Sequence, residues 1–361
     1  MKRRYTFFFK ISIAMTVGLV TLLILFVDNS GFLGNLLSGA RLDGVQELQA
    51  QTQLEPGVPV TTQNTESSSE LHFAVISDLH VRSTDENAQA KVENALSDLL
   101  DPQRSPLDLI VVNGDLGDGL PADYRVLNQL IQKVRSRSTQ KTPLLFTMGN
   151  HEFYKAYHDP KTEAWNKETF PNGETDEQAV QRFLDFSGRD QVYTDRVMKG
   201  YHFIFLGSEK SAMSDPKIGD GVYLSEEQLT WLKQKLAENA DPQKPIFVFL
   251  HQPLFTDKGD SPIHTQYVQQ QEELAKILEA YPQVVLFSGH LHLKIGAPGT
   301  AVHDAFTLFG DSSVTRVRQA TAEASEGLMV TVDGSKVTVQ GRDFEYHQPI
   351  PQSDIALNYG T

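Results

Sequence analysis

The chain has 361 residues, of which 40% are hydrophobic and 22% are charged, and this composition is typical of a globular protein rather than a fibrous or disordered one. Its 46 acidic and 32 basic residues give a formal net charge of −14, which argues against a nucleic-acid groove, because phosphate binding needs clustered Lys and Arg. The absence of cysteine excludes disulfide scaffolds, thiolate metal sites, iron–sulfur clusters and cysteine nucleophiles.

The first 27 residues differ from the rest of the chain. They contain four basic residues and no acidic one, and residues 11–27 form a run without any charge. At a helical rise of ~1.5 Å per residue this run reaches ~25 Å. We therefore predict that residues 1–28 are a cytoplasmic basic tip and a single-pass transmembrane anchor of the signal-anchor type, with the rest of the chain on the extracytoplasmic side of the cell membrane.

A cleaved signal peptide is the alternative to an anchor, and it would make the protein secreted. Residues 29–70 are the predicted extracytoplasmic linker, because residues 51–69 are polar and poor in aromatics and would bury too little apolar surface to offset the entropy of the chain. After Val27 the chain carries 28 basic and 46 acidic residues, so the exported part has a net charge of −18.

From Leu71 onward, short apolar runs alternate with longer amphipathic ones, which predicts an α/β domain over residues 71–346. The predicted strands in chain order are 71–77, 107–112, 143–147, 202–206, 245–250 and 284–287. The predicted helices are 87–100, 122–134, 176–186, 226–238 and 266–280. Three further strands, at 305–309, 327–332 and 336–340, follow without helices, and we expect them to complete a second sheet. Residues 347–361 are predicted to be a C-terminal tail.

Polar clusters follow five of the predicted strands. They are Asp78-Leu79-His80, the segment from Asn113 to Gly119, Gly149-Asn150-His151-Glu152, His251-Gln252, and Gly289-His290-Leu291-His292. Any one cluster alone is typical of an ordinary turn or a buried polar residue. Ligands of open α/β sheets bind beyond the carboxyl ends of the strands, so the ordered set predicts one shared site.

The side chains of this set are carboxylates, imidazoles and one amide, with no sulfur. Such ligands suit Mn, Fe, Zn or Co better than Ca or Mg, and they do not distinguish among these metals. Seven ligands are too many for one tetrahedral ion. They fit two divalent or mixed-valence transition-metal ions that share a carboxylate ~3.5–4 Å apart, an arrangement used for phosphoryl hydrolysis.

The ordered series resembles the motifs of the calcineurin-like metallophosphoesterase superfamily, D-x-H, G-D-x-x-D, G-N-H-[E/D], H and G-H-x-H, over residues 71–293. The resemblance implies a four-layered α/β/β/α sandwich with a dinuclear metal centre. One ion would be held by Asp78, His80 and His292. The other would be held by Asn150, His251 and His290, with Asp115 bridging both.

The resemblance also implies two residues with catalytic roles. His151 would contact the phosphate and help the leaving group depart, and Asp118 would orient His151. In the implied mechanism the two cations lower the pKa of a bridging water, and the resulting hydroxide attacks phosphorus in line. No covalent enzyme intermediate is required.

At one position the chain departs from part of this superfamily, and the difference indicates which branch it resembles. The Ser/Thr phosphatases of this superfamily have an arginine where this chain has Gly119, so a guanidinium clamp is missing there. The motif spacing and the G-H-L-H ending are instead similar to those of the cyclic-nucleotide and glycerophosphodiester phosphodiesterase branch.

We therefore expect a membrane-anchored, exported phosphoesterase that hydrolyses a small phosphodiester or phosphomonoester. The alternatives are a nucleotidase, a lipid or cell-wall pyrophosphatase, and a non-catalytic, metal-stabilised surface protein. A nucleic-acid substrate is disfavoured by the charge of −18, and no protein partner can be inferred from the sequence. Substrate-binding residues are not fixed by the sequence. Candidates in the long segment after His151 are Tyr154, Tyr157, His158 and Trp165, unless that segment packs on its own aromatic side chains.

Overall fold

A computed structural model describes residues 70–162, 164–238, 240–254 and 267–360. The predicted anchor and nearly all of the predicted linker lie outside these ranges. Within them, no helix has both the length and the apolar character needed to cross a membrane.

The first sheet contains the first strand of the domain in its interior. It comprises β1 (Leu71–Ile76), β2 (Leu109–Asn113), β3 (Leu144–Thr147), β10 (Glu326–Asp333), β11 (Lys336–Asp343), β12 (Gln348–Pro349) and β13 (Ile355–Asn358). The strand order is β12-β11-β10-β1-β2-β3, and β13 also pairs with β11. β1, β2 and β3 are parallel, whereas β10 runs antiparallel to β1.

The second sheet comprises β4 (Thr194–Met198), β5 (Tyr201–Phe205), β6 (Ile246–Phe249), β7 (Val284–Ser288), β8 (Ala301–His303) and β9 (Thr307–Gly310). Its order is β4-β5-β6-β7-β9-β8. The four central strands are parallel, and the two edge strands are antiparallel to their neighbours. Within each sheet the parallel strands therefore end at one edge, where their polar clusters follow.

Aromatic side chains fill the space between the two sheets. Phe73 of β1 contacts Phe203 of β5 and Phe247 of β6 edge to face, with ring centroids 5.2 and 4.9 Å apart. Phe249 and Phe287 join the same buried cluster. Because both faces of these strands are covered, they read in sequence as short continuous apolar runs.

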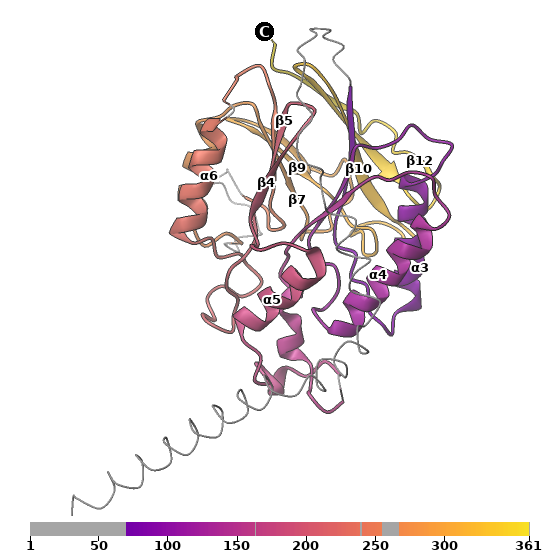
Figure 1. Ribbon diagram of the computed structural model, residues 1–361, viewed down its shortest axis with the longest axis vertical. Helices are drawn as coiled ribbons and strands as arrows, with labels where there is room; N and C mark the ends of the chain where they lie inside the picture. Colours follow the sequence, from indigo (N-terminus) through magenta and orange to yellow (C-terminus); the bar gives the residue numbers. More distant parts are fainter. Residues whose placement is uncertain (1–69, 163, 239, 255–266, 361) are drawn as a thin grey trace, which may run out of the picture. The chain divides into compact units, whose positions relative to one another are not determined.

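Helices cover the outer face of each sheet (Figure 1). Helices α3 (Glu86–Leu99), α4 (Pro121–Arg135) and α5 (Asp176–Ser187) pack on the side of the first sheet. Helices α6 (Glu226–Glu238) and α7 (Gln271–Glu279) pack on the second. Two short 3₁₀ helices, η1 (His151–Tyr157) and η2 (Lys167–Thr169), follow β3. The order helix, sheet, sheet, helix is the predicted four-layered sandwich.

Two expectations about the end of the chain need correction. The hairpin β10–β11 was expected to complete the second sheet, but it extends the first sheet through β1. Alternating polarity identifies a hairpin but does not say which sheet edge it joins. Residues 347–361, expected as a tail, supply β12 and β13, which pair with β11. These two strands are too short to give a periodic signal.

Candidate metal centre

The structure brings the predicted ligand side chains together at the carboxyl ends of five strands. Asp78 and His80 follow β1, Asp115 follows β2, and Asn150 follows β3. His251 follows β6, and His290 and His292 follow β7.

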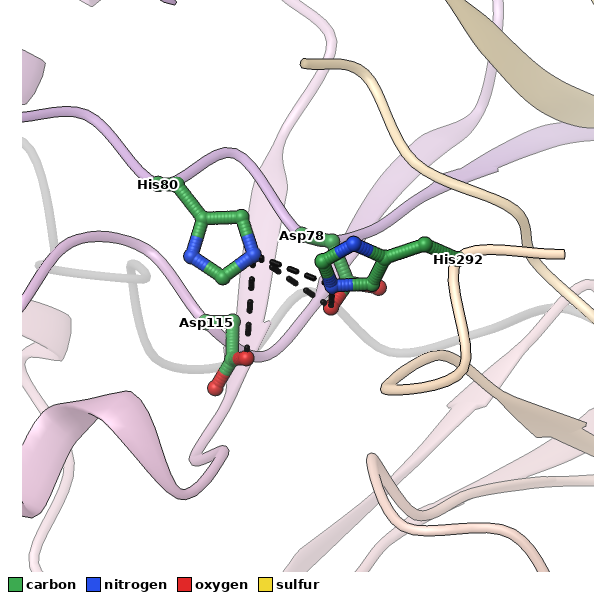
Figure 2. Close-up of side chains that lie close together, drawn as sticks. All are labelled: Asp78, His80, Asp115 and His292. Carbon is green, nitrogen blue, oxygen red and sulfur yellow. Dashed lines mark hydrogen bonds and ion pairs between the residues drawn. The ribbon is translucent and has the colours of Figure 1, made fainter. Parts of the chain in front are cut away.

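Two groups of donor atoms, sharing one carboxylate, lie close enough to hold a metal ion each. One group is Asp78, His80, Asp115 and His292, drawn in Figure 2, and the other is Asp115, His251 and His290. Within each group the donor atoms all lie within 4.8 Å of one another. The shared residue is Asp115, the predicted bridge.

The donor atoms have the spacing of metal ligands. His80 Nε2 lies 3.1 Å from His292 Nε2, and His251 Nε2 lies 3.2 Å from Asp115 Oδ2. Two ligand atoms each ~2.1 Å from one metal, at 90–110°, are ~3.0–3.4 Å apart. Asp78 Oδ1, 2.8 Å from His292 Nε2, and His251 Nε2, 3.2 Å from Asp115 Oδ2, are buried and make no hydrogen bond of acceptable geometry with the described residues. Because buried polar atoms are normally satisfied, these two fit a cation.

The hydrogen bonds on the far side of two imidazoles select the tautomer that a metal needs. His251 Nδ1 donates to the Asn113 carbonyl oxygen at 2.7 Å, and His292 Nδ1 donates to the Arg316 carbonyl oxygen at 3.2 Å. Since a carbonyl oxygen only accepts, the proton sits on Nδ1 of each ring. When each ring is neutral, as metal binding requires, its Nε2 lone pair is therefore directed toward the site.

Asn150 is oriented by its neighbour Tyr154. The Asn150 amide nitrogen donates to the Tyr154 hydroxyl at 3.0 Å, and this hydroxyl donates to Asp220 Oδ1 at 2.7 Å. The amide oxygen of Asn150 then faces His290 Nδ1, 2.9 Å away. The amide oxygen is thus available as a ligand beside the His290 ring.

Backbone strain is concentrated at the predicted ligands. Asp78, His80, Asp115, His290 and His292 have φ between 42° and 67°. This left-handed region is uncommon for residues other than glycine and tends to mark functional sites. The turns that end β1, β2 and β7 therefore point these side chains to one place at a conformational cost.

Two glycines permit the close approach of these turns. A Cβ on Gly149 would overlap Asp115 Oδ1 and would lie 2.9 Å from His251 Cδ2. A Cβ on Gly289 would overlap Ser77 Oγ. The glycines of the G-N-H and G-H-x-H clusters are thus required because a larger side chain would clash with neighbouring atoms.

Glu152 supports the centre from behind, a role that the sequence analysis did not assign. Its buried carboxylate accepts hydrogen bonds from the backbone N–H groups of Asp115, Leu116 and Gly149, at 3.2, 2.8 and 2.6 Å. Burial and the nearby Asp115 raise the pKa of Glu152 to about 7. In the sequence, the only indication of this role was that an acidic residue ends the G-N-H-E cluster.

His151 and Asp118, the two predicted catalytic residues, are hydrogen-bonded to each other. His151 Nδ1 lies 2.8 Å from Asp118 Oδ1, so His151 Nε2 is left on the side of Asp115 Oδ2, 3.8 Å away. Arg82 Nε lies 2.7 Å from the other Asp118 oxygen. Burial raises the pKa of Asp118, but hydrogen bonds from His151 and His158 and the Arg82 charge outweigh it and hold that pKa far below its ordinary value. Arg82 stands in none of the sequence motifs, so its role is visible only in the structure.

Charges within the centre shift the other pKa values. Burial raises the pKa of Asp78, but the His292 and His251 charges outweigh it and bring the pKa to about 2. Burial lowers the pKa of His290, and the His251 charge lowers it further, to about 4. Asp78 as a carboxylate and His290 as a neutral imidazole are the protonation states that bind metals.

A cleft of about 860 Å³ opens over the donor atoms. Its lining includes the predicted site residues Asp115, Asn150, His151, His290 and His292. The lining also includes Tyr154, Lys217, Asp220, Tyr267, Arg316 and Arg318. The cleft is large enough for a small organic phosphate ester.

Of the aromatic residues after His151, some pack against one another and one, Tyr154, also lines the cleft. Tyr157 stacks on Trp165 and on Phe170, with ring centroids 4.8 and 4.4 Å apart. These rings support the interpretation of a segment packed on itself. Tyr154 lines the cleft and lies 3.9 Å from the His151 ring, centroid to centroid.

Comparisons with known proteins agree with this geometry. The sequence model of a family described as calcineurin-like phosphoesterase matches residues 71–294. A dimetal phosphatase from Danio rerio has a similar structure (TM-score 0.56, 15% identity, 80% of this chain and 99% of that one). So has a purple acid phosphatase from yellow lupin seeds, Lupinus luteus (TM-score 0.52, 12% identity, 81% of this chain and 54% of that one). At these identities the two structures show a shared fold, and no curated protein matches the sequence.

Proposed function

Because this chain belongs to the calcineurin-like phosphoesterase family and is a metal-dependent phosphoric ester hydrolase, we propose that it hydrolyses a small phosphodiester or phosphomonoester at a two-metal centre. One ion would be held by Asp78, His80 and His292. The other would be held by Asn150, His251 and His290, and Asp115 would be shared by both. The observation that carries this proposal is the pair of donor groups that share Asp115 and contain buried atoms without hydrogen bonds.

The residues around the centre have different roles in the proposed reaction. Bound divalent ions supply positive charge for the phosphoryl oxygens and make a bound water more acidic. His151, when protonated, donates a hydrogen bond through Nε2 to the phosphoryl group and gives its proton to the departing oxygen. Asp118 and Arg82 hold the His151 ring in that orientation, since Asp118 accepts from Nδ1 and pairs with Arg82.

Gly119 supports the phosphodiesterase-like branch of the family. Its φ is 69°, and a Cβ there would overlap the Glu152 carbonyl oxygen. An arginine at this position would therefore be strained. The backbone conformation at Gly119 thus disfavours the guanidinium clamp of the Ser/Thr phosphatases. We propose that the chain belongs to the cyclic-nucleotide and glycerophosphodiester phosphodiesterase-like branch.

The location of the enzyme is proposed from the sequence alone. Residues 1–28 anchor the chain in the cell membrane, residues 29–70 form the linker, and the catalytic domain is extracytoplasmic. Cleavage of the N-terminal segment would instead release a secreted enzyme. An anchored enzyme would meet substrates close to the membrane, as in the lipid or cell-wall pyrophosphatase alternative.

The test of this function uses the full-length protein in a nonionic detergent, stripped of metal and reloaded with Mn, Fe, Zn or Co. Bis-p-nitrophenyl phosphate is compared with p-nitrophenyl phosphate, and the variant His151→Ala is assayed in parallel. We expect metal-dependent turnover of the diester that falls ~10²–10⁴-fold in the variant. Turnover of the monoester alone would indicate a phosphatase or nucleotidase. Bound metal without any turnover would contradict the proposal and favour a surface binding protein.

A further inference from the structure

The segment between β9 and β10 carries two arginines past the metal centre. Residues 313–318, here called the arginine loop, are attached to the turn after β1: Ser313 Oγ and Thr315 Oγ1 donate to the Asp78 carbonyl oxygen at 3.0 and 3.1 Å. On the other side, the Arg318 backbone N–H donates to the His292 carbonyl oxygen at 2.7 Å. The loop is thus fixed to two turns that hold predicted metal ligands.

A buried lysine reinforces this attachment from helix α3. Lys91 is 8% exposed, and its ammonium group donates to the carbonyl oxygens of Thr315, Ala322 and Ala324 at 3.1, 2.6 and 3.1 Å. Burying an ammonium group is costly unless all its protons are bonded, as they are here. The arginine loop therefore has one defined position relative to the metal centre.

The two arginine side chains of the loop are free to bind a ligand. Arg316 and Arg318 both line the cleft, and neither guanidinium group forms a hydrogen bond or an ion pair with any residue in the described ranges. Arg82, by contrast, is committed to Asp118 at 2.7 Å. Lys217, which lines the cleft too, also lacks a side-chain partner among the described residues.

Arg316 is the more informative of the pair because it is half-buried. Burial and the Arg82 charge lower the pKa of Arg316, and its own charge in turn helps to lower the pKa of the buried His80. Its guanidinium is therefore partly removed from water near the centre; the charges of Asp118, Asp115 and Asp85 act in the opposite direction, but none of these carboxylates is hydrogen-bonded or ion-paired to it among the described residues. Guanidinium groups bind planar oxyanions through two parallel hydrogen bonds, so a phosphate or a carboxylate would satisfy it.

We propose that Arg316 and Arg318 bind a second anionic group of the substrate, beside the phosphoryl group that reacts. This inference rests on the proposed phosphoesterase function and narrows its substrate class. The substrate is a phosphate ester that carries a further oxyanion, either a second phosphate, as in a pyrophosphate diester, or a carboxylate. The metal ions and His151 receive the reacting phosphoryl group, and the arginine loop receives the second anion.

The test measures the binding of small phosphonates to the metal-loaded, full-length protein by calorimetry. Methylphosphonate carries one anionic group, methylenebisphosphonate carries two, and phosphonoacetate carries a phosphonate and a carboxylate. The variants are Arg316→Gln, Arg318→Gln and the charge-retaining Arg316→Lys. The control is Arg137→Gln, an exposed arginine in the turn after α4 that pairs with Glu93 outside the cleft. Metal content and unfolding temperature are measured for each variant.

We expect each Arg→Gln variant to weaken the binding of a two-anion ligand about 5–10-fold, and to change methylphosphonate binding less than about twofold. Arg316→Lys should give a smaller loss, and the control none. A larger loss for methylenebisphosphonate identifies the second group as a phosphate, and a larger loss for phosphonoacetate identifies it as a carboxylate. Equal losses for methylphosphonate and the two-anion ligands, or no loss in either Arg→Gln variant, would overturn the proposal.

Calorimetry needs no turnover, so the result is independent of the activity assay. A protein that binds the two-anion ligands through these arginines, but hydrolyses no ester, would confirm the anion-binding role of Arg316 and Arg318 and remove the proposed function.

Discussion

At the residue scale, the predicted ligands are held by strained backbone and by specific hydrogen bonds. Each non-glycine residue with positive φ costs of order 1–3 kcal/mol, and Asp78, His80, Asp115, His290 and His292 share this feature. Metal binding would offset part of this cost, because the ligands are already oriented when the ion arrives. Residues beyond the ligands, such as Tyr154 and Asp118, then control orientation and can be tested individually.

The variant Tyr154→Phe removes the hydroxyl that accepts from Asn150 and donates to Asp220. The Asn150 amide should then rotate more freely, and we expect the affinity of one metal site to fall about 10-fold, as is typical when a partner of a ligand is lost. Metal titration of the stripped protein measures this. The other site should keep its affinity, and an equal loss at both sites would contradict a role acting through Asn150.

The variant Asp118→Asn keeps the shape of the side chain but alters its contact with His151. Since an amide does not enforce the Nδ1–H tautomer of His151, kcat for the diester should fall about 10²-fold or more, with KM changed little. Steady-state kinetics with matched metal content measures both constants. A rise in KM with unchanged kcat would show that Asp118 does not act through His151.

The site residues that stand in ordered motifs could be predicted from the sequence. Residues that contact the site from other parts of the fold could not. All the predicted ligands meet at one place because each follows a buried strand. Arg82 and Arg316 stand in no recognisable pattern, and Glu152 stands in a motif that does not reveal its supporting role. These roles come from contacts across 30 or more residues, or from a loop fixed by Lys91. Such contacts are set by the packing of the sheets, which a single sequence does not display.

At the element scale, the tight turns after the strands determine whether the site forms. The turn after β3 is the clearest case, because Gly149 lies against Asp115 and His251. Buried parallel strands are easily predicted, as β1, β2, β5, β6 and β7 were. Edge strand β4 was missed because most of its residues are partly or fully exposed and two of them are charged.

The variant Gly149→Ala tests this turn. The added methyl would overlap the Asp115 carboxylate, so we expect a loss of about 1–3 kcal/mol in the free energy of unfolding together with weakened metal binding. Chemical denaturation of the metal-free protein gives the first quantity. The matched control is Gly310→Ala, whose Cβ would make only ordinary contacts with Thr300 at 3.5 Å or more. Equal stability of the two variants would argue against a packed turn.

At the scale of the whole molecule, the site joins both sheets of the sandwich. Asp78 and Asp115 come from the first sheet, whereas His251 and His292 come from the second. The layered architecture could be predicted because the strand and helix order is regular. The sheet joined by β10 and β11 could not, because pairing with β1 depends on which edge is free after the sandwich assembles. The anchor at residues 11–27 stays a prediction.

Because the metal centre links the two sheets, metal removal should lower the stability of the entire domain. At metal concentrations 100-fold above Kd, each site adds about 2.7 kcal/mol to the free energy of unfolding. We therefore expect a chelator to lower the unfolding temperature by several degrees, and reloading to restore it. Calorimetric scans with and without metal measure the shift, and an unchanged unfolding temperature would argue against ions bound between the sheets.

The most direct test of the central claim is the metal stoichiometry of the purified full-length protein. Elemental analysis after equilibrium dialysis against Mn or Zn should give two ions per chain for the wild type. Asp115→Ala should bind fewer than two, because both ions lose the shared carboxylate, whereas Arg137→Gln should keep two. A wild-type chain that binds one ion, or an Asp115→Ala variant that still binds two with unchanged affinity, would contradict a dinuclear centre bridged by Asp115.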